Sequence, residues 1–494
     1  MRDQSWRACA WIFLGSLLVQ AAWILTLSPF RGSDEFDHVY RAASVAEGYW
    51  STTGEFSDRG RGELVRVPAA IVDDARPMCE SLPYTQHDNC NAASTFPDGT
   101  VTVASAAARY NPVFYWLIGK PAQPFEGAAA MYVMRAMSAL LCSLFLAGAA
   151  WAVMRWARTV WPMVSLVLVL TPVTIYSTAV AAPNGLEMLA AAGAAVTLLA
   201  LPRVRHQDLR MILGLACVFA STLAVLRGLG PLFLLCIGVM TLQVVGPRRL
   251  FGVLRQVPGT ATAAAAVVLV STLAGAWWTM SAGSMELEDA NAQGNPLVDT
   301  LTAVPLWFFQ SIAAFPLRNE PADPIVYAAG IVVLGGFLVL ALRRGTRRGR
   351  IDLLVTFGIA LVVPVALQTA VYETSGDIWQ GRYGWPISLV VLIVAGLNLE
   401  DWHGRSKWTR PLLLAGAAAW TLAHTWSTVA LVVKEQAGGV YVGDSRWVTA
   451  PPVVIAALTI VGCLFWYASV RESRSVTTAR EASTAPQEPD LLSL

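Results

Sequence analysis

The first residues that could do chemistry lie in the polar segment RGSDEFDHVYR, which directly follows the first long apolar run. If residues 34–49 form a helix, Asp34, His38 and Arg41 share one face, and Glu35 lies beside it. A carboxylate, an imidazole and a fixed cation can take a proton from a hydroxyl group and hold a phosphate beside it. The alternative is that Asp34 only caps the helix and that the other side chains are solvated. Capping needs one acid and the segment has three, which favours the catalytic interpretation.

The second candidate is the segment YETSGDIWQGRYGWP, which leads into a late apolar run. Arg382 stands at the start of this run, next to Gln380 and Tyr383. An arginine at a membrane surface can bind a lipid phosphate through two hydrogen bonds, and aromatic residues suit that depth. The alternative is an ordinary interfacial arginine that extends its guanidinium towards water.

Three further polar residues fall at the ends of apolar runs, namely Arg135, Asn184 and Glu187. A charge inside a bilayer is costly unless it is paired. We therefore predict an ion pair between Glu187 and Arg135, with a role in lining the substrate cavity as the alternative.

Two other polar features have simpler interpretations. Arg318, Glu320 and Asp323 could form a gate over the cavity or plain surface, and the sequence favours neither. His424, within a late apolar run, is predicted to be a helix-packing contact.

The composition places these residues in a membrane protein. The chain has 494 residues, of which 55% are hydrophobic and 14% are charged, well beyond the apolar share of soluble domains. With 35 basic and 33 acidic residues, it has no strong positive field that would favour binding to nucleic acid. The expected surroundings are a lipid bilayer.

Taking about 20 apolar residues as one crossing, we predict an all-α bundle of twelve transmembrane helices. The predicted spans are 8–29, 130–153, 160–182, 185–202, 210–227, 230–246, 259–281, 324–342, 351–371, 384–399, 411–432 and 450–469.

The basic clusters then orient the bundle. They flank alternate ends of the predicted spans, so they all fall on one side, which the positive-inside rule makes cytoplasmic. Both termini are therefore predicted to be cytoplasmic, in a multi-pass plasma-membrane protein whose active site faces the extracytoplasmic side. The predicted regions are 1–29 (N-terminus and first span), 30–129 (extracytoplasmic loop with the catalytic helix), 130–281 (spans two to seven), 282–323 (extracytoplasmic loop with an interfacial helix), 324–469 (spans eight to twelve) and 470–494 (disordered tail).

The loop over 30–129 is the one connection large enough to hold soluble structure. Its middle, from Arg59 to Thr100, is rich in Pro, Gly, Asp and Asn, and we predict that it is irregular. Cys79 and Cys90 lie in this part, where an extracytoplasmic location would allow a disulfide. The other five cysteines fall inside apolar runs, where a thiol behaves as a small hydrophobe. The segment NPVFYWLIG at the end of the loop is predicted to lie in the membrane interface.

The segments DEFDHVYRAASVAEG, NPVFYWLIG, PNGLE at the start of a span and QGRYGWP carry a family resemblance. Together with an acidic pair after the first span and an enlarged first outward loop, they resemble the GT-C superfamily of membrane glycosyltransferases. More narrowly, they resemble a bacterial, actinobacterial-looking family of multispanning proteins often grouped with it.

The resemblance implies a polyprenyl-phosphate sugar as donor, Asp34 or Glu35 as catalytic residue and a donor phosphate near Arg382. Related sequences often have an Asn and an Asp at the head of the fourth span, where this chain has Asn184 and Glu187. Usage rich in Arg, Ala and Trp resembles that of actinobacteria, which implies decaprenyl-phosphate arabinofuranose or mannose as donor.

We therefore expect an inverting glycosyltransferase with a cell-envelope glycan or a lipid-linked acceptor. Asp34 is the expected base, while Glu35 assists it or helps Asp34 to hold a divalent cation, which is the one cofactor that the residues suggest. Arg382 and Arg41 would stabilise the departing phosphate. The remaining expected substrate-binding residues are His38, Asn184, Glu187, Gln380 and Tyr383.

Two alternatives from other classes stay open. A flippase or transporter of a lipid-linked saccharide would be expected to show matching halves, and we find no internal repeat. A non-catalytic scaffold for envelope assembly would tolerate replacement of Asp34 and Glu35.

Overall fold

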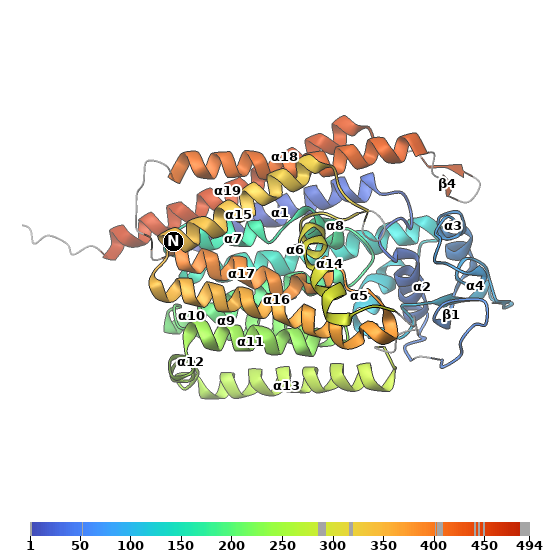
Figure 1. Cartoon of the computed structure of the whole chain (residues 1–494), viewed down its shortest axis with the longest axis horizontal. Helices are drawn as coiled ribbons and strands as arrows, with labels where there is room; N and C mark the ends of the chain where they lie inside the picture. Colours follow the sequence, from blue (N-terminus) through green and yellow to red (C-terminus); the bar gives the residue numbers. More distant parts are fainter. Residues whose placement is uncertain are drawn as a thin grey trace, which may run out of the picture.

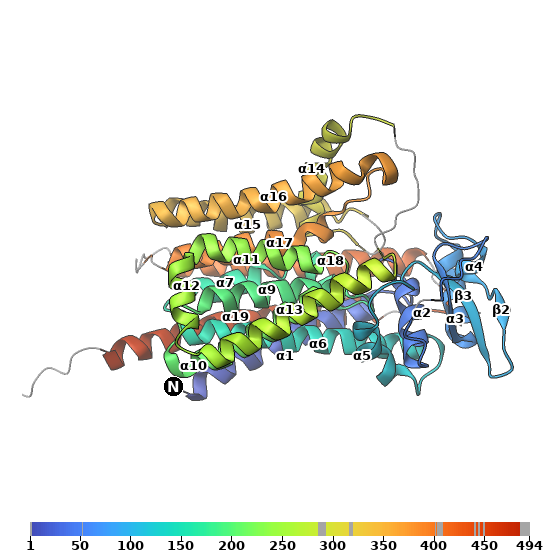
Figure 2. The same ribbon diagram turned by 90° about the horizontal axis from the view of Figure 1, so that it is seen from below.

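The computed structural model describes residues 2–51, 53–284, 293–315, 320–400, 402, 409–438, 441–442, 445–447 and 450–484. Long helices lie side by side along one axis, and a smaller domain covers one end of them (Figures 1 and 2). The N-terminus lies at the opposite end of the bundle (Figure 1).

Eight helices of the described chain are long and apolar enough to cross a membrane. They are α1 (Arg2–Thr26), α6 (Gly127–Trp156), α10 (His206–Leu226), α13 (Pro258–Ser281), α15 (Pro324–Arg344), α16 (Arg347–Ser375), α17 (Gly381–Glu400) and α19 (Pro452–Thr484). Between them lie α7 (Trp161–Leu168), α8 (Pro172–Thr178), α9 (Asn184–Ala200), α11 (Gly230–Val245), α12 (Pro247–Leu254), α14 (Pro296–Ile312) and α18 (Thr409–Gly438). The chain is thus a polytopic membrane protein whose bundle is all-α, as predicted.

The predicted count of twelve spans is not reached by these criteria. The described chain gives eight spans, or up to ten if each of two bent helix pairs counts as one. The predicted span over 160–182 is broken into α7 and α8, which meet at 67°. Pro172 begins α8, and Thr171 caps it by accepting a hydrogen bond from the Thr174 amide. A proline at the first helical position starts a helix but cannot continue the one before it.

The domain at the end of the bundle contains α2 (Glu35–Ala46), α3 (Ala69–Glu80), α4 (His87–Cys90) and α5 (Pro112–Ala122). Its antiparallel sheet has the order β1–β3–β2, from β1 (Glu63–Pro68), β2 (Ser94–Thr95) and β3 (Thr100–Ser105). The disulfide between Cys79 and Cys90 joins α3 to α4.

The prediction that Arg59 to Thr100 is irregular is therefore wrong. Buried and partly exposed residues alternate along ELVRVP of β1, the pattern of a half-buried strand. The segment NPVFYWLIG, predicted to lie in the membrane interface, begins α5, which packs against α2 and α6. Asn111 caps α5 by accepting a hydrogen bond from the Val113 amide, and Pro112 starts it.

The predictions for the second outward loop and for the tail have different outcomes. Helix α14 runs across the long helices in the segment where a surface helix is predicted (Figure 1). The predicted disordered tail is wrong in part, because α19 continues to Thr484. The hairpin β4 (Tyr441–Val442) and β5 (Ser445–Arg446) lies near α3.

Candidate functional site

Asp34 lies at the junction between the first long helix and the end domain. It immediately precedes α2 with a left-handed backbone (φ 54°), a conformation that Asp tolerates better than most residues. Its side chain makes no capping hydrogen bond to α2, so the capping alternative is wrong. Its Oδ2 atom instead lies 3.4 Å from Nη2 of Arg382. The two predicted segments, 348 positions apart, meet at this contact.

The start of α17 positions Arg382. Gly381 packs so closely on α14 that a Cβ atom there would lie 2.0 Å from the Trp307 carbonyl oxygen, and its amide donates to Oε1 of Gln310 at 2.7 Å. The side chain of Arg382 is 5% exposed and that of Asp34 is 18% exposed. The Nε atom of Arg382 is buried and has no hydrogen-bond partner among the described atoms. A buried guanidinium with an unused N–H group next to a partly exposed carboxylate is suited to binding an anion.

A second arginine, which the sequence analysis missed, joins this group. Arg227 follows α10, and its Nη1 atom lies 3.2 Å from Oε2 of Glu187. The Cζ atoms of Arg227 and Arg382 lie 5.1 Å and 5.3 Å from the centre of the Tyr383 ring. Two guanidinium groups thus share one aromatic ring beside Asp34. The available signal was an arginine between two predicted spans on the side opposite to the basic clusters.

His38 lies one helical turn after Asp34 and is 6% exposed. Its Nδ1 atom is 2.8 Å from the hydroxyl of Tyr115, and its ring stacks against Tyr110 and Tyr115. Burial lowers the pKa of His38 to about 4, against the opposing charge of Asp34. His38 is therefore neutral at neutral pH, and it supports the wall of the site rather than supplying a cation.

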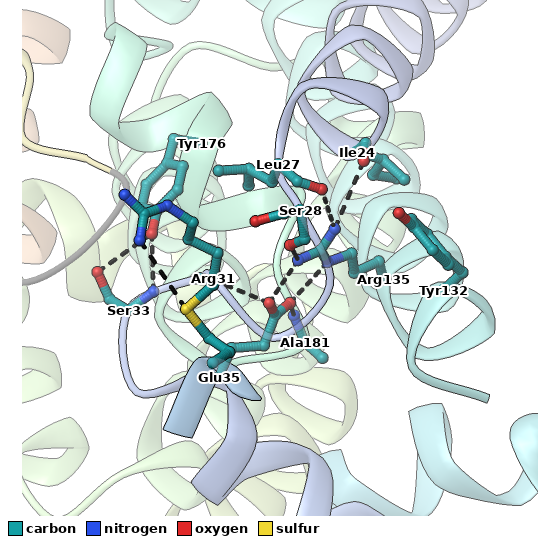
Figure 3. A network of polar contacts seen from close by, with 12 residues as sticks. Ile24, Leu27, Ser28, Arg31, Ser33, Glu35, Tyr132, Arg135, Tyr176 and Ala181 are labelled. Atoms are coloured by element: carbon teal, nitrogen blue, oxygen red, sulfur yellow. Dashed lines mark hydrogen bonds and ion pairs between the residues drawn. The ribbon is translucent and has the colours of Figure 1, made fainter. Parts of the chain in front are cut away.

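Glu35 points away from this group, into an ion pair with Arg135 (Figure 3). Both side chains are fully buried, with Nη2 of Arg135 2.5 Å from Oε2 and Nε 2.8 Å from Oε1 of Glu35. The amides of Gly32 and Ala181 donate to the same carboxylate at 2.9 Å and 3.1 Å. Burial alone would raise the pKa of Glu35, but Arg135 and these amides lower it below its usual value.

The predicted pair between Arg135 and Glu187 is wrong, because Arg135 pairs with Glu35 and Glu187 with Arg227. Arg135 also donates to the carbonyl oxygens of Leu27 and Ser28 at 2.9 Å and 2.8 Å. These contacts join α6 to the end of α1 and to the start of α2 (Figure 3). They hold the chain on both sides of Asp34, so Glu35 and Arg135 position the site.

The surroundings of Glu35 do not fit the predicted divalent cation. Its two oxygens already accept four hydrogen bonds from Arg135, Gly32 and Ala181. Within the described residues, no group of three or more His, Cys, Asp or Glu side chains could hold a metal ion. Asp34 and Glu35 thus do not form a shared metal site in this arrangement.

Arg41 does not join Arg382 either, contrary to the shared face predicted for it. Its guanidinium donates to the carbonyl oxygens of Tyr49, Trp50 and Tyr110 at 3.3, 2.8 and 3.2 Å. It thereby holds the turn after α2 and the segment before α5 together.

The remaining predicted residues lie directly before α17, at the start of α9 and within α18. Gln380 is buried directly before α17, while Asn184 is the partly exposed first residue of α9. His424 packs edge-on between the rings of Trp420 and Trp466, as a packing contact would.

The possible gate is only partly described. Glu320 accepts from Lys434 at 2.7 Å, and Asp323 precedes α15. Arg318 lies outside the described residues.

No curated protein sequence matches the chain. The structure is similar to ArnT from Cupriavidus metallidurans bound to undecaprenyl phosphate, with 14% identity over 96% of this chain and 79% of that one and a TM-score of 0.42. It is also similar to an oligosaccharyltransferase from Archaeoglobus fulgidus in complex with zinc and sulfate, with 14% identity over 85% of this chain and 52% of that one and a TM-score of 0.34. Both TM-scores lie below 0.5, so neither similarity assigns an activity.

The family comparison covers most of the chain. Residues 17–391, which include the last part of α1, the end domain and Arg382, match the family model described as "Predicted membrane protein (DUF2142)". This match extends over more than half of the 494 residues. The chain belongs to this family of membrane proteins.

Proposed function

We propose that this protein is a membrane glycosyltransferase that moves a sugar from a polyprenyl-phosphate donor to a hydroxyl group of a glycan or glycolipid acceptor. The contact between Asp34 and Arg382 is the observation that carries the proposal. It combines a proton acceptor with a phosphate-binding cation at one end of a membrane bundle. The donor class follows from the motif resemblance around these same two residues.

In the proposed reaction, the acceptor oxygen attacks the anomeric carbon of the donor sugar. The hydroxyl proton passes to the carboxylate of Asp34 as the new glycosidic bond forms. The bond between the anomeric carbon and the phosphate oxygen breaks, and its electron pair stays on the phosphate. Attack from the face opposite to the phosphate inverts the anomeric centre.

Arg382 and Arg227 act on the leaving group. Hydrogen bonds from Arg382 stabilise the negative charge that develops on the phosphate. Glu187 holds Arg227 at 3.2 Å, and the Tyr383 ring keeps the two guanidinium groups close together. Because a phosphate is a good leaving group, no protein acid is required on that side.

The proposed function includes an orientation of the protein in the membrane and a place for each substrate. We place the site on the extracytoplasmic face and both termini in the cytoplasm, on the strength of the basic clusters. The end domain that contains α2 would then meet the acceptor, and the donor lipid would reach Arg382 from the bilayer. Arabinofuranose and mannose are the donor sugars to test first.

The test is a transfer assay in proteoliposomes that contain the purified full-length protein. The donor is decaprenyl-phosphate mannose or arabinofuranose with a radioactive sugar, and the acceptors are short synthetic glycosides. We expect the label to move to the acceptor and free decaprenyl phosphate to accumulate in equal amount. Movement of intact donor between the leaflets without cleavage would instead identify a flippase. If neither donor is cleaved and neither moves between the leaflets, the proposal is contradicted.

A further inference from the structure

An apolar groove lies between α7, α15, α18 and α19, far from Asp34. Its volume is about 460 Å³. Its lining is mostly apolar, with side chains such as Val332, Phe337, Trp420 and Trp466. The lining residues come from the part of the bundle remote from the α2 domain (Figure 1).

The length of the groove matches one half of a bilayer. Along α15 the lining extends from Val332 to Arg344, and twelve steps of about 1.5 Å give roughly 18 Å. The hydrocarbon core of a bilayer is about 30 Å thick, so one leaflet accounts for about 15 Å of it. The groove therefore has room for an extended acyl chain that runs from the membrane surface towards its centre.

The two ends of the groove differ in charge. Arg343 and Arg344 line one end and are exposed. The Cζ atom of Arg344 lies 5.5 Å from the centre of the Trp402 ring, which stacks on Trp161 at 5.7 Å. Arginine and tryptophan side chains together are typical of the level of the lipid headgroups. An apolar groove that ends in two cations at this level is complementary to a lipid with an anionic headgroup.

We propose that this groove binds an anionic phospholipid, with one acyl chain along α15 and its phosphate on Arg343 and Arg344. Such a lipid would join α15 to α18 and α19 on the opposite wall. The site is independent of the proposed glycosyl transfer, because Asp34, which contacts Arg382, directly precedes α2, and α2 lies at the other end of the bundle (Figure 1).

Glycines allow the groove to be filled without disturbing its walls. A Cβ atom at Gly416, which lines the groove, would meet no atom within 4 Å. Gly335 on α15 is equally open but does not line the groove. Gly416→Phe therefore occupies the space of the acyl chain, and Gly335→Phe is its matched control.

The test uses the full-length protein in detergent and native mass spectrometry during titration with dioleoyl phosphatidylglycerol or dioleoyl phosphatidylcholine. We expect phosphatidylglycerol to bind at least tenfold more tightly. In Arg343→Gln/Arg344→Gln we expect its affinity to fall about thirtyfold, the effect of removing two cations at a membrane surface. Arg248→Gln/Arg249→Gln removes two exposed arginines of α12 and should change the affinity less than twofold.

The Gly416→Phe variant, in which the new side chain fills the groove, gives a second, independent measurement. We expect Gly416→Phe to weaken the binding of phosphatidylglycerol at least tenfold, while Gly335→Phe binds it as the unchanged protein does. Equal affinity for the two lipids, or undiminished binding by the double arginine variant, would overturn the proposal. If Gly416→Phe fails to fold, the arginine variant decides the question alone.

Discussion

The guanidinium of Arg382 lies against the carboxylate of Asp34, with 3.4 Å between Nη2 and Oδ2. Asp34 precedes the first helix of the end domain, and Arg382 lies in the first turn of a helix that is buried for most of its length. The proposed base and a phosphate-binding cation therefore belong to one site. An inverting displacement needs both groups at one site, on opposite faces of the sugar carbon.

The role of Arg382 predicts different effects of its two simplest replacements. Arg382→Gln should lower kcat for transfer by about 10² to 10³, the usual effect of removing one donor that stabilises developing negative charge. Arg382→Lys keeps the charge without the planar fork, so it should retain more activity. Steady-state rates with decaprenyl-phosphate sugar measure both, with Arg66→Gln in the end domain as control. Equal activity of Arg382→Gln and the unchanged protein would exclude Arg382 from the site.

Because Glu35 and Arg135 form a buried ion pair, replacing one of them should destabilise the protein. Breaking a buried pair by replacing one partner costs roughly 3–5 kcal/mol, whereas replacing both by apolar residues costs much less. Glu35→Gln should therefore melt at a clearly lower temperature in detergent, and Glu35→Leu/Arg135→Met should recover part of the loss. A Glu35→Gln protein that melts normally but transfers no sugar would mean that Glu35 takes part in the reaction.

His38 predicts a dependence of stability on pH. Because its pKa is about 4 in the folded chain and about 6.5 when unfolded, protonation favours the unfolded state between these values. Its contribution is complete above about pH 6.5 and is lost as the pH falls towards 4, at a cost of about 3 kcal/mol. His38→Gln does not titrate, so its melting temperature should fall less between pH 7.5 and 4.5. The same decrease in both proteins would contradict a buried, neutral His38.

The disulfide between Cys79 and Cys90 should stabilise the end domain. Its sequence separation of 11 residues corresponds to about 3 kcal/mol in the loop-closure description. Cys79→Ser/Cys90→Ser should speed amide hydrogen exchange in α3 and α4 while leaving the long helices unchanged. Cys217→Ser removes a free thiol and serves as control; identical exchange in the two variants would show that the disulfide adds no stability.

Part of the site follows from the sequence because its residue types are unusual for their positions. Asp34 and Arg382 are charges at the ends of apolar runs, on the side opposite to the basic clusters, and the structure brings them into contact. The same reasoning applies to Arg227, which lies between two short apolar runs on that same side. Apolar runs of about 20 residues likewise predicted the long helices.

The choice of ion-pair partners does not follow from the sequence. The predicted topology places both Glu35 and Glu187 on the same side of the membrane as Arg135. The packing of α6 against the end of α1 selects Glu35 as its partner. Arg41 has the correct helical spacing from Asp34, yet three carbonyl oxygens of the end domain bind it. Glu35 and Arg135 are 100 positions apart, and the carbonyl partners of Arg41 lie 8, 9 and 69 positions from it, so helical spacing alone does not encode these choices.

The most direct measurement of the central claim is the rate of sugar transfer by Asp34→Asn in proteoliposomes. The amide keeps the size of the side chain but cannot accept the hydroxyl proton, so we predict a fall of about 10² to 10⁴ in kcat. Glu47→Gln removes an exposed carboxylate at the other end of α2 and should leave the rate unchanged. Transfer by Asp34→Asn at the rate of the unchanged protein would contradict the assignment of Asp34 as the base.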